Sequence, residues 1–292
     1  MDLLILCQFV LAGLSAGAVY ALIALGFSVV HNATGIVNFA QGDFLVVGAF
    51  VAYSVLVSWG LPYWVAFLAA VFTAALVGFL LERWALSRSR SKEILLLVFI
   101  TVGASIFLRG LIKEIWGKRP FVLPPISETR EISWATFAID PQYFWIIGIT
   151  LLAFASLHFF FRHTLWGKAI RAVAIDAEAA ALMGIPVPWA VAASFALAGA
   201  LGGLAGVLIG PIWPLSFESG VHIGLKGFAA AVLGGYGSFG GALLGGFLLG
   251  LLEGLGAYFT SSLKNLIAYG ILLLVLLLRP QGLLGEKVQE RL

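Results

Sequence analysis

The sequence predicts an all-α, polytopic membrane protein of about eight transmembrane helices, with broken or re-entrant segments and an inverted repeat. Hydrophobic residues make up 61% of the 292 residues and charged residues 11%, against roughly 25% charged residues in soluble domains. Apolar runs recur along the chain near the length of roughly 20 residues that a helix needs to cross a bilayer. The 35 glycines are typical of closely packed membrane helices. We expect residues 1–292 to form a single transmembrane domain.

The first two spans are predicted to be separated by a break in the membrane. An apolar run over residues 3–30 leads into a polar and glycine-containing stretch over residues 31–43, and a second run follows over residues 44–59. The first run lacks the basic start of a cleaved signal peptide, so we expect a retained helix. Its lack of Lys and Arg favours an external N-terminus.

Basic residues orient the middle of the chain. A third span over residues 62–84 ends among basic residues, namely Arg83, Arg88, Arg90 and Lys92. Such a cluster is typical of a cytoplasmic loop. A fourth span over residues 94–116 then leads to an external connection over residues 118–141, and a fifth span over residues 143–161 returns to the cytoplasm.

The connection over residues 162–188 is predicted to be a cytoplasmic loop that contains a helix. Residues 172–182 are strongly helix-forming, Gly184 is placed to end the helix, and Pro186 prevents its continuation. Charged Asp176 and Glu178 lie among apolar residues, so this surface could bind a partner. Composition alone also fits a simple interfacial linker.

The last third of the chain predicts a half-span and three full spans. A sixth span covers residues 189–212, a half-span covers 225–235, a longer run reaches 259, and the last span covers 266–278. A closely packed turn carries the glycines Gly234, Gly235, Gly237, Gly240 and Gly241. The last span ends at Arg279, near Lys287 and Arg291, which favours a cytoplasmic C-terminus.

Two similar Gly/Ala-rich segments suggest the inverted repeat. Residues 13–25 and 199–210 are each followed by a polar break and another apolar segment. The predicted topology makes the two spans run in opposite directions, as in transporters built from inverted halves.

The break between the first two spans offers candidate residues for a solute path, namely Asn38, Phe39, Gln41 and Asp43. Non-helical backbone inside a bilayer is tolerated only when it is buried in protein or lines a wet cavity. Such a break is where a solute could pass between the two sides. The alternative is that these side chains cap helix ends and hold the break rigid.

Three other charged residues lie in or near the predicted spans. Glu218 and Lys226 lie near predicted span ends, where long side chains can reach water. Glu253 lies deeper and is the one acidic residue that we expect to be an intramembrane group.

Several classes of function lack a candidate site in the sequence. The four histidines and the single Cys7 show no metal-ligand spacing, and no catalytic constellation can be proposed. The short basic clusters do not form a nucleic-acid-binding face. The chain has no Gly-x-x-x-x-Gly-Lys-Ser/Thr phosphate loop, so we expect it neither to hydrolyse ATP nor to act as an enzyme.

Two motifs resemble those of a known family. Glu178-Ala179-Ala180-x-x-x-Gly184 matches the loop by which permeases of bacterial ABC importers dock onto their ATPase. Residues 35–44 resemble a signature of the branched-chain amino acid permeases of the LivH type. The resemblance extends to residues 234–241 and to Arg279-Pro280-x-Gly282-Leu283, and so covers essentially the whole chain.

The resemblance implies a permease subunit of the bacterial inner membrane that imports branched-chain or other hydrophobic amino acids by alternating access. The implied partners are a second, LivM-like permease, two cytoplasmic ABC ATPases, a periplasmic or lipid-anchored amino acid binding protein and membrane lipid. ATP and Mg would be bound by the ATPases, and no cofactor by this chain. The implied ATPase-coupling residues are Arg171, Asp176, Glu178, Ala179, Ala180 and Gly184.

Three alternatives remain open from the residues. The same type of importer could carry urea, short amides or other amino acids. A passive channel would need no ATPase. An intramembrane enzyme would need paired His, Asp or Glu residues on adjacent spans, for which only Glu253 offers a deep acidic group.

Overall fold

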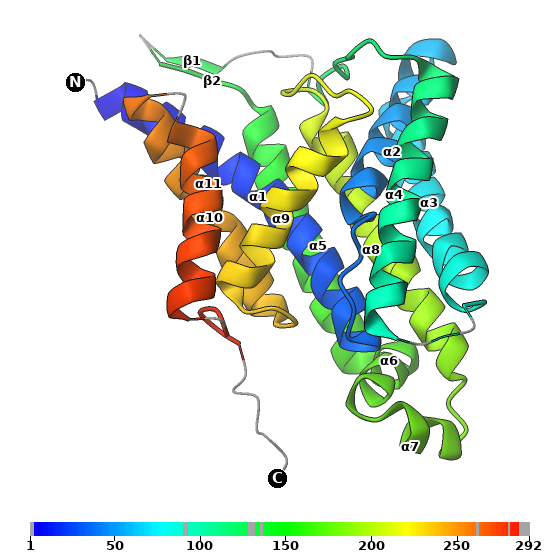
Figure 1. The fold of residues 1–292 in the computed structure, drawn as a ribbon. Coiled ribbons are helices and arrows are strands. Elements are labelled where there is room, and N and C mark those ends of the chain that lie inside the picture. Colours follow the sequence, from blue (N-terminus) through cyan, green and yellow to red (C-terminus); the bar gives the residue numbers. More distant parts are fainter. Residues whose placement is uncertain are drawn as a thin grey trace.

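The computed structural model is a bundle of membrane-length helices (Figure 1). It describes residues 3–89, 91, 93–127, 132–134, 137–260, 263–279 and 281–285. Arg90, Lys92, Pro280, Lys287 and Arg291, which entered the predicted topology and motifs, lie outside these ranges.

The order of elements follows the predicted spans. The helices are α1 (Leu3–Thr34), α2 (Gln41–Tyr53), η1 (Ser54–Ser58), α3 (Tyr63–Leu80), η2 (Leu81–Leu86), α4 (Ile94–Trp116), α5 (Gln142–His163), α6 (Leu165–Ile175), α7 (Ala177–Leu182), α8 (Val187–Ile209), α9 (Ser219–Gly234), α10 (Phe239–Phe259) and α11 (Leu263–Leu278). The π-helical segments η1 and η2 continue α2 and α3. A short antiparallel hairpin, β1 (Ile132–Trp134) and β2 (Phe137–Ile139), pairs Ser133 with Ala138 in the predicted external connection.

The prediction of an all-α polytopic membrane protein is confirmed. Within the described ranges, seven helices are long and apolar enough to span a membrane, and α9 and the Tyr269–Leu278 part of α11 are shorter apolar helices. The half-span is longer than predicted, because α9 begins at Ser219 and includes polar residues that the sequence pattern assigned to a loop. The first break is shorter than predicted, because α1 continues to Thr34.

The packing has the inverted symmetry suggested by the sequence. Helix α1 packs along α10 and α8 packs along α3, while α9 contacts α1 and α2 contacts α8. The equivalent helices run in opposite directions in Figure 1: α1 and α8, α2 and α9, α3 and α10, and α4 and α11. Helices α5, α6 and α7 lie between the two halves in sequence. The fold therefore consists of two inverted halves joined by a segment that has no counterpart among the described residues.

Small residues allow the two equivalent helix pairs to pack closely. A Cβ atom on Gly250 of α10 would overlap the backbone of Gly13 and Gly17 of α1. In the other half, a Cβ atom on Gly199 of α8 would overlap the backbone of Ala74 of α3. Backbone contact of this kind is the usual reason for glycine between membrane helices.

The outer helices present apolar side chains to the surroundings. Most side chains of α3, α4 and α5 are not buried, in contrast to those of α1 and α8. Large exposed residues on these helices include Leu68, Phe72, Phe99, Phe107 and Leu152. Such a surface suits lipid or the apolar surface of another membrane subunit.

Candidate solute path and coupling loop

The segment between α1 and α2 is an ordered break inside the bundle. Gly35 takes a left-handed conformation with φ 71° directly after α1, which glycine adopts without steric cost. The Asn38 Oδ1 accepts a hydrogen bond from the Ala40 N–H at 3.1 Å, and the Thr101 hydroxyl of α4 accepts one from the Phe39 N–H at 3.1 Å. Side chains thus satisfy backbone groups that a helix would otherwise pair.

The polar residues predicted for a solute path lie at this break. Asn38, Gln41 and Asp43 are fully buried, whereas the Phe39 side chain is 42% exposed. The Gln41 Nε2 donates to the Ala198 carbonyl of α8 at 2.9 Å. The Asn38 and Gln41 side chains thus bind backbone groups of the break and of α8.

The three buried polar side chains at the break do not use all of their hydrogen-bond donors and acceptors. The Asn38 Nδ2, the Gln41 Oε1 and the Asp43 Oδ1 form no hydrogen bond with the described residues. Unsatisfied buried polar atoms are costly and rare in folded proteins. A structural role for these side chains therefore leaves unused donor and acceptor atoms at the break.

Arg109 of α4 is a neighbour of the break that the sequence pattern did not indicate. Its Nε lies 3.8 Å from the Asp43 Oδ1, and its side chain is 29% exposed. The available signal was a single arginine within the apolar run of residues 94–116. Its partner lies on another helix, so the sequence pattern could not pair the two.

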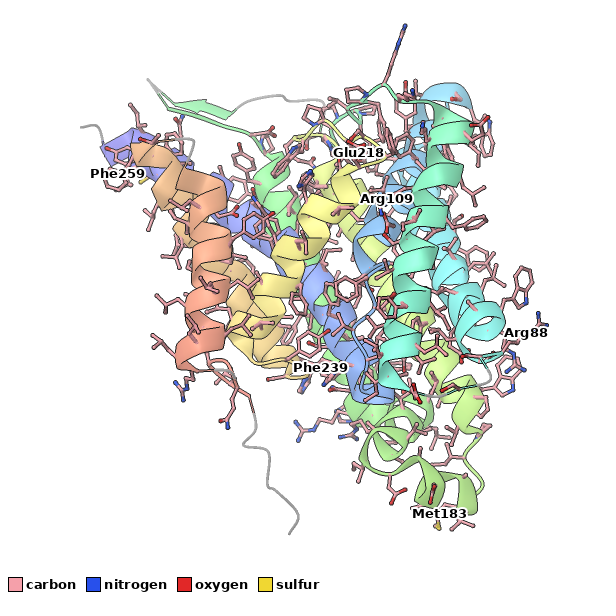
Figure 2. The ribbon with its side chains drawn as sticks, viewed as in Figure 1. Arg88, Arg109, Met183, Glu218, Phe239 and Phe259 are labelled. Atoms are coloured by element: carbon pink, nitrogen blue, oxygen red, sulfur yellow. The ribbon has the colours of Figure 1, made fainter. Side chains whose placement is uncertain are left out.

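The predicted coupling loop protrudes from one end of the bundle. Helices α6 and α7 lie at the end opposite the β1–β2 hairpin and the N-terminus (Figure 1). Apolar side chains on this loop are highly exposed: Ile175 is 85%, Leu182 89% and Met183 83% exposed. Met183 lies at the tip in Figure 2.

The prediction of one helix over residues 172–182 is wrong. Asp176 adopts an extended conformation and separates α6 from α7. Its carboxylate accepts hydrogen bonds from the N–H groups of Glu178 and Ala179, at 3.0 and 2.9 Å. An aspartate that caps a new helix N-terminus in this way competes with continuation of the preceding helix.

The other predicted coupling residues lie on both helices. Arg171, Glu178, Ala179 and Gly184 are exposed, and Ala180 is buried. Gly184 follows the end of α7 with φ 83°, as predicted for the residue that ends the helix. A short connection then leads into α8 at Val187.

A cavity of about 670 Å³ joins two of the predicted regions. Arg171 of α6 lines it together with Gly237 of the glycine turn and with His31 and Asn32 of α1. The Asn32 Nδ2 donates to the Gly237 carbonyl at 2.8 Å. The coupling loop, the end of α1 and the glycine turn thus line one cavity.

The glycine turn between α9 and α10 is tight, as predicted. Gly235 and Gly237 have φ values of 109° and 90°, and a Cβ atom on Gly234 would overlap the Gly241 backbone. The segment after α11 packs on this turn, because the Leu284 N–H donates to the Gly234 carbonyl at 2.8 Å. Of the predicted glycines here, Gly240 alone has open space at its Cβ position and a φ outside the left-handed region.

Lys226 and Glu253 form an ion pair inside the bundle. The Lys226 Nζ lies 2.9 Å from the Glu253 Oε1, and the two side chains are 5% and 1% exposed. The Tyr20 hydroxyl of α1 donates to the Glu253 Oε2 at 2.9 Å. The expectation that Lys226 reaches water is therefore wrong, because a buried carboxylate one helix away pairs with its charge.

Glu253 was expected to be the one acidic residue inside the bundle, but other acidic residues are buried too. Asp43 and Glu82 are buried acidic residues as well, at 1% and 4% exposure. Within the described part of the chain, His, Cys, Asp and Glu residues form no group of three or more that could hold a metal ion.

Comparison with known proteins identifies one family and relatives that cover almost the whole chain. Residues 9–276 match the family model described as "Branched-chain amino acid transport system / permease component". The chain is 33% identical over 296 residues to the high-affinity branched-chain amino acid transport system permease protein LivH of Salmonella typhimurium, with 96% of this chain and 95% of LivH covered. It is 34% identical over 298 residues to the corresponding protein BraD of Pseudomonas aeruginosa, with 97% of each covered.

A solved structure shares the fold. PsaBC from Streptococcus pneumoniae in complex with Fab matches with a TM-score of 0.52 and 17% sequence identity, over 94% of this chain and 93% of the matched one. At this identity the likeness bears on the fold alone.

Proposed function

Because this chain belongs to the family of branched-chain amino acid transport system permease components, we propose that it is the permease subunit of an ABC importer. Its cargo in this proposal is a branched-chain or other hydrophobic amino acid, which it carries into the cytoplasm by alternating access. The observation that carries the proposal is the coupling loop, which projects exposed apolar side chains from one end of a membrane bundle.

Exposed apolar residues on a surface loop are typical of a docking site. Ile175, Leu182 and Met183 offer apolar contacts, while Asp176 and Glu178 add charge at the start of α7. In the proposed assembly this surface docks onto a cytoplasmic ABC ATPase. Helices α6 and α7 contact α8, and α8 contacts α1, α2 and α3. Movement of the loop would therefore reach both halves of the bundle.

The proposed assembly contains a second, LivM-like permease, two ATPases that bind ATP and Mg, and a periplasmic or lipid-anchored binding protein for the amino acid. This chain would bind no cofactor and hydrolyse no ATP. The basic residues support a cytoplasmic location for the coupling loop, and with it an external N-terminus and a cytoplasmic C-terminus in a bacterial inner membrane. Arg88 and Met183 lie toward the same end of the bundle in Figure 2.

Substitution of Gly184 by valine is expected to uncouple ATP hydrolysis from uptake. A β-branched residue at φ 83° is strained by at least roughly 1–2 kcal/mol, so the connection from α7 to α8 must change conformation. We expect amino acid uptake by the reconstituted importer to fall about tenfold or more, while ATP hydrolysis continues and the subunit remains in the membrane.

Gly117 provides a matched control at the opposite end of the bundle. It has φ 86° and, like Gly184, open space where a Cβ atom would lie. The Gly117→Val variant should also strain a backbone that has positive φ, but it should keep hydrolysis and uptake coupled. Coupled uptake by the Gly184→Val variant, or equal uncoupling in both variants, would contradict the proposed role of the loop.

The cargo and the energy source can be tested in the same vesicles. Radiolabelled leucine and urea distinguish an amino acid importer from one for urea or short amides. Uptake that persists when the ATPases are inactivated would identify a passive channel instead.

A further inference from the structure

A cavity of about 150 Å³ lies between α4 and α9, beside the break that follows α1. Its lining includes Phe39 of the break, Ser105 and Arg109 of α4, and Val221 and Leu225 of α9. Its volume is about ten times the room of roughly 10–15 Å³ that one water needs. The cavity is therefore large enough for a small solute, and its walls are apolar apart from one cation and one hydroxyl.

Arg109 is directed toward the interior of the bundle and away from the nearer membrane surface. It lies seven residues before the end of α4 at Trp116, roughly 10 Å along the helix axis. A snorkelling arginine would extend toward that end. Instead its Nε donates to the Ser105 carbonyl at 3.3 Å, one turn closer to the middle of the helix. Figure 2 shows Arg109 between α4 and α9, in the half of the bundle that contains Glu218.

The guanidinium keeps donors available. The hydrogen bond and the ion pair that Arg109 forms with the described residues both involve Nε. The hydrogen bond is to the Ser105 carbonyl, and the ion pair is with the Asp43 carboxylate oxygen at 3.8 Å. An arginine has five N–H donors in a planar fork, which binds carboxylates through two parallel hydrogen bonds. The two terminal nitrogens of Arg109 are thus free of hydrogen bonds to the described residues, beside the cavity.

A partly exposed arginine at this depth is costly if it faces hydrocarbon. The arrangement is stable only where protein or water covers this face. Asp43 supplies a nearby negative charge, and its Oδ1 is 3.8 Å away and forms no hydrogen bond with the described residues. The pair is therefore loose enough for the guanidinium to accept a second anionic partner.

We propose that this cavity binds the carboxylate of a small solute with an apolar side chain, with Arg109 as the anion-binding residue. Phe39, Val221 and Leu225 contact the apolar part of the solute, and Asp43 is a positioning residue that balances the charge of Arg109. The inference rests on the proposed function, since it assigns the contact that the transported amino acid makes inside the permease.

Thiol labelling of the assembled importer tests the charge of the cavity without measuring transport. In a Cys7→Ser background, Val221→Cys places a single thiol of this chain in the cavity wall. An anionic and a cationic methanethiosulfonate of similar size are compared. We expect the ratio of anionic to cationic labelling rates to fall roughly tenfold on Arg109→Gln, because one nearby positive charge is removed.

Matched variants separate charge from misfolding. Arg119→Gln removes the same charge from an exposed position after α4 and should leave the ratio unchanged. Arg109→Lys should retain most of the preference, and Asp43→Asn should increase it. The double variant Arg109→Gln/Asp43→Asn leaves no unpaired buried charge and should still lose it. A ratio that is the same in wild type, Arg109→Gln and the double variant would overturn the proposal.

Protection by ligands tests the chemical class. Saturating leucine should slow the labelling of Val221→Cys, whereas leucinamide, which lacks the carboxylate, should not. The difference should vanish in Arg109→Gln. Equal protection by both compounds, or no protection by leucine in an importer that transports leucine, would refute the site and leave the proposed function intact. An anion preference without leucine uptake would refute the proposed cargo and leave the anion site intact.

Discussion

Replacement of Glu253 by alanine is expected to destabilise the bundle by about 3–5 kcal/mol, the usual cost of removing one partner of a buried ion pair. The Lys226 ammonium would then be buried at 4% exposure without its carboxylate, and the Tyr20 hydroxyl would lose its acceptor. Helices α1, α9 and α10 meet at this cluster, so the loss is expected to affect all three. The free energy of unfolding in mixed micelles and the midpoint of thermal inactivation measure it.

A double variant distinguishes the contribution of the two charges from the contribution of the volume that the two side chains fill. Glu253→Leu combined with Lys226→Met removes both charges and retains much of the volume, so it should be far less destabilising than Glu253→Ala. Glu218→Ala, at an exposed position before α9, is the control for loss of a glutamate. Equal stability of Glu253→Ala and Glu218→Ala would show that the pair contributes nothing measurable.

Replacement of Gly250 by valine is expected to prevent assembly of the folded bundle. The added Cβ would overlap the Gly13 carbonyl oxygen and the Gly17 backbone. Overpacking of a core typically costs about 1–3 kcal/mol when side chains can move, and here the obstacle is the backbone of α1. The expected cost is therefore above this range, with loss of folded subunit from the membrane as measured by expression and gel filtration.

Gly148 of α5 is a suitable control for this substitution. It also lies in a membrane-spanning helix, but nothing lies within 4 Å of the position where its Cβ would be. Gly148→Val should be tolerated and should assemble normally. Normal assembly of Gly250→Val would show that α1 and α10 can separate without loss of the fold.

The spans were predictable because the bilayer imposes a simple rule on sequence. A helix that crosses hydrocarbon needs a continuous apolar run, so the runs at residues 94–116 and 143–161 correspond closely to α4 and α5. The glycine turn was predictable for a related reason. Gly235 and Gly237 occupy conformations that other residues resist.

Contacts between distant segments were not predictable. Tyr20 and Glu253 are 233 positions apart, and nothing local indicates that they meet. Lys226 resembled a residue near a span end, and only the position of α10 beside α9 shows that it pairs with Glu253. The division of the coupling loop at Asp176 had a local cause, its side-chain cap, but the strong helix preference of the surrounding alanines obscured it.

The position of α5, α6 and α7 between two inverted halves has a mechanical consequence. Each half repeats the helix packing of the other in the opposite orientation, so the packing of the two halves alone does not distinguish one side of the membrane from the other. The inserted segment is the part of the chain that breaks this equivalence. In the proposed importer, a force applied to α7 would therefore act on the two halves unequally, through the contacts of α6 and α7 with α8 and of α6 with α1.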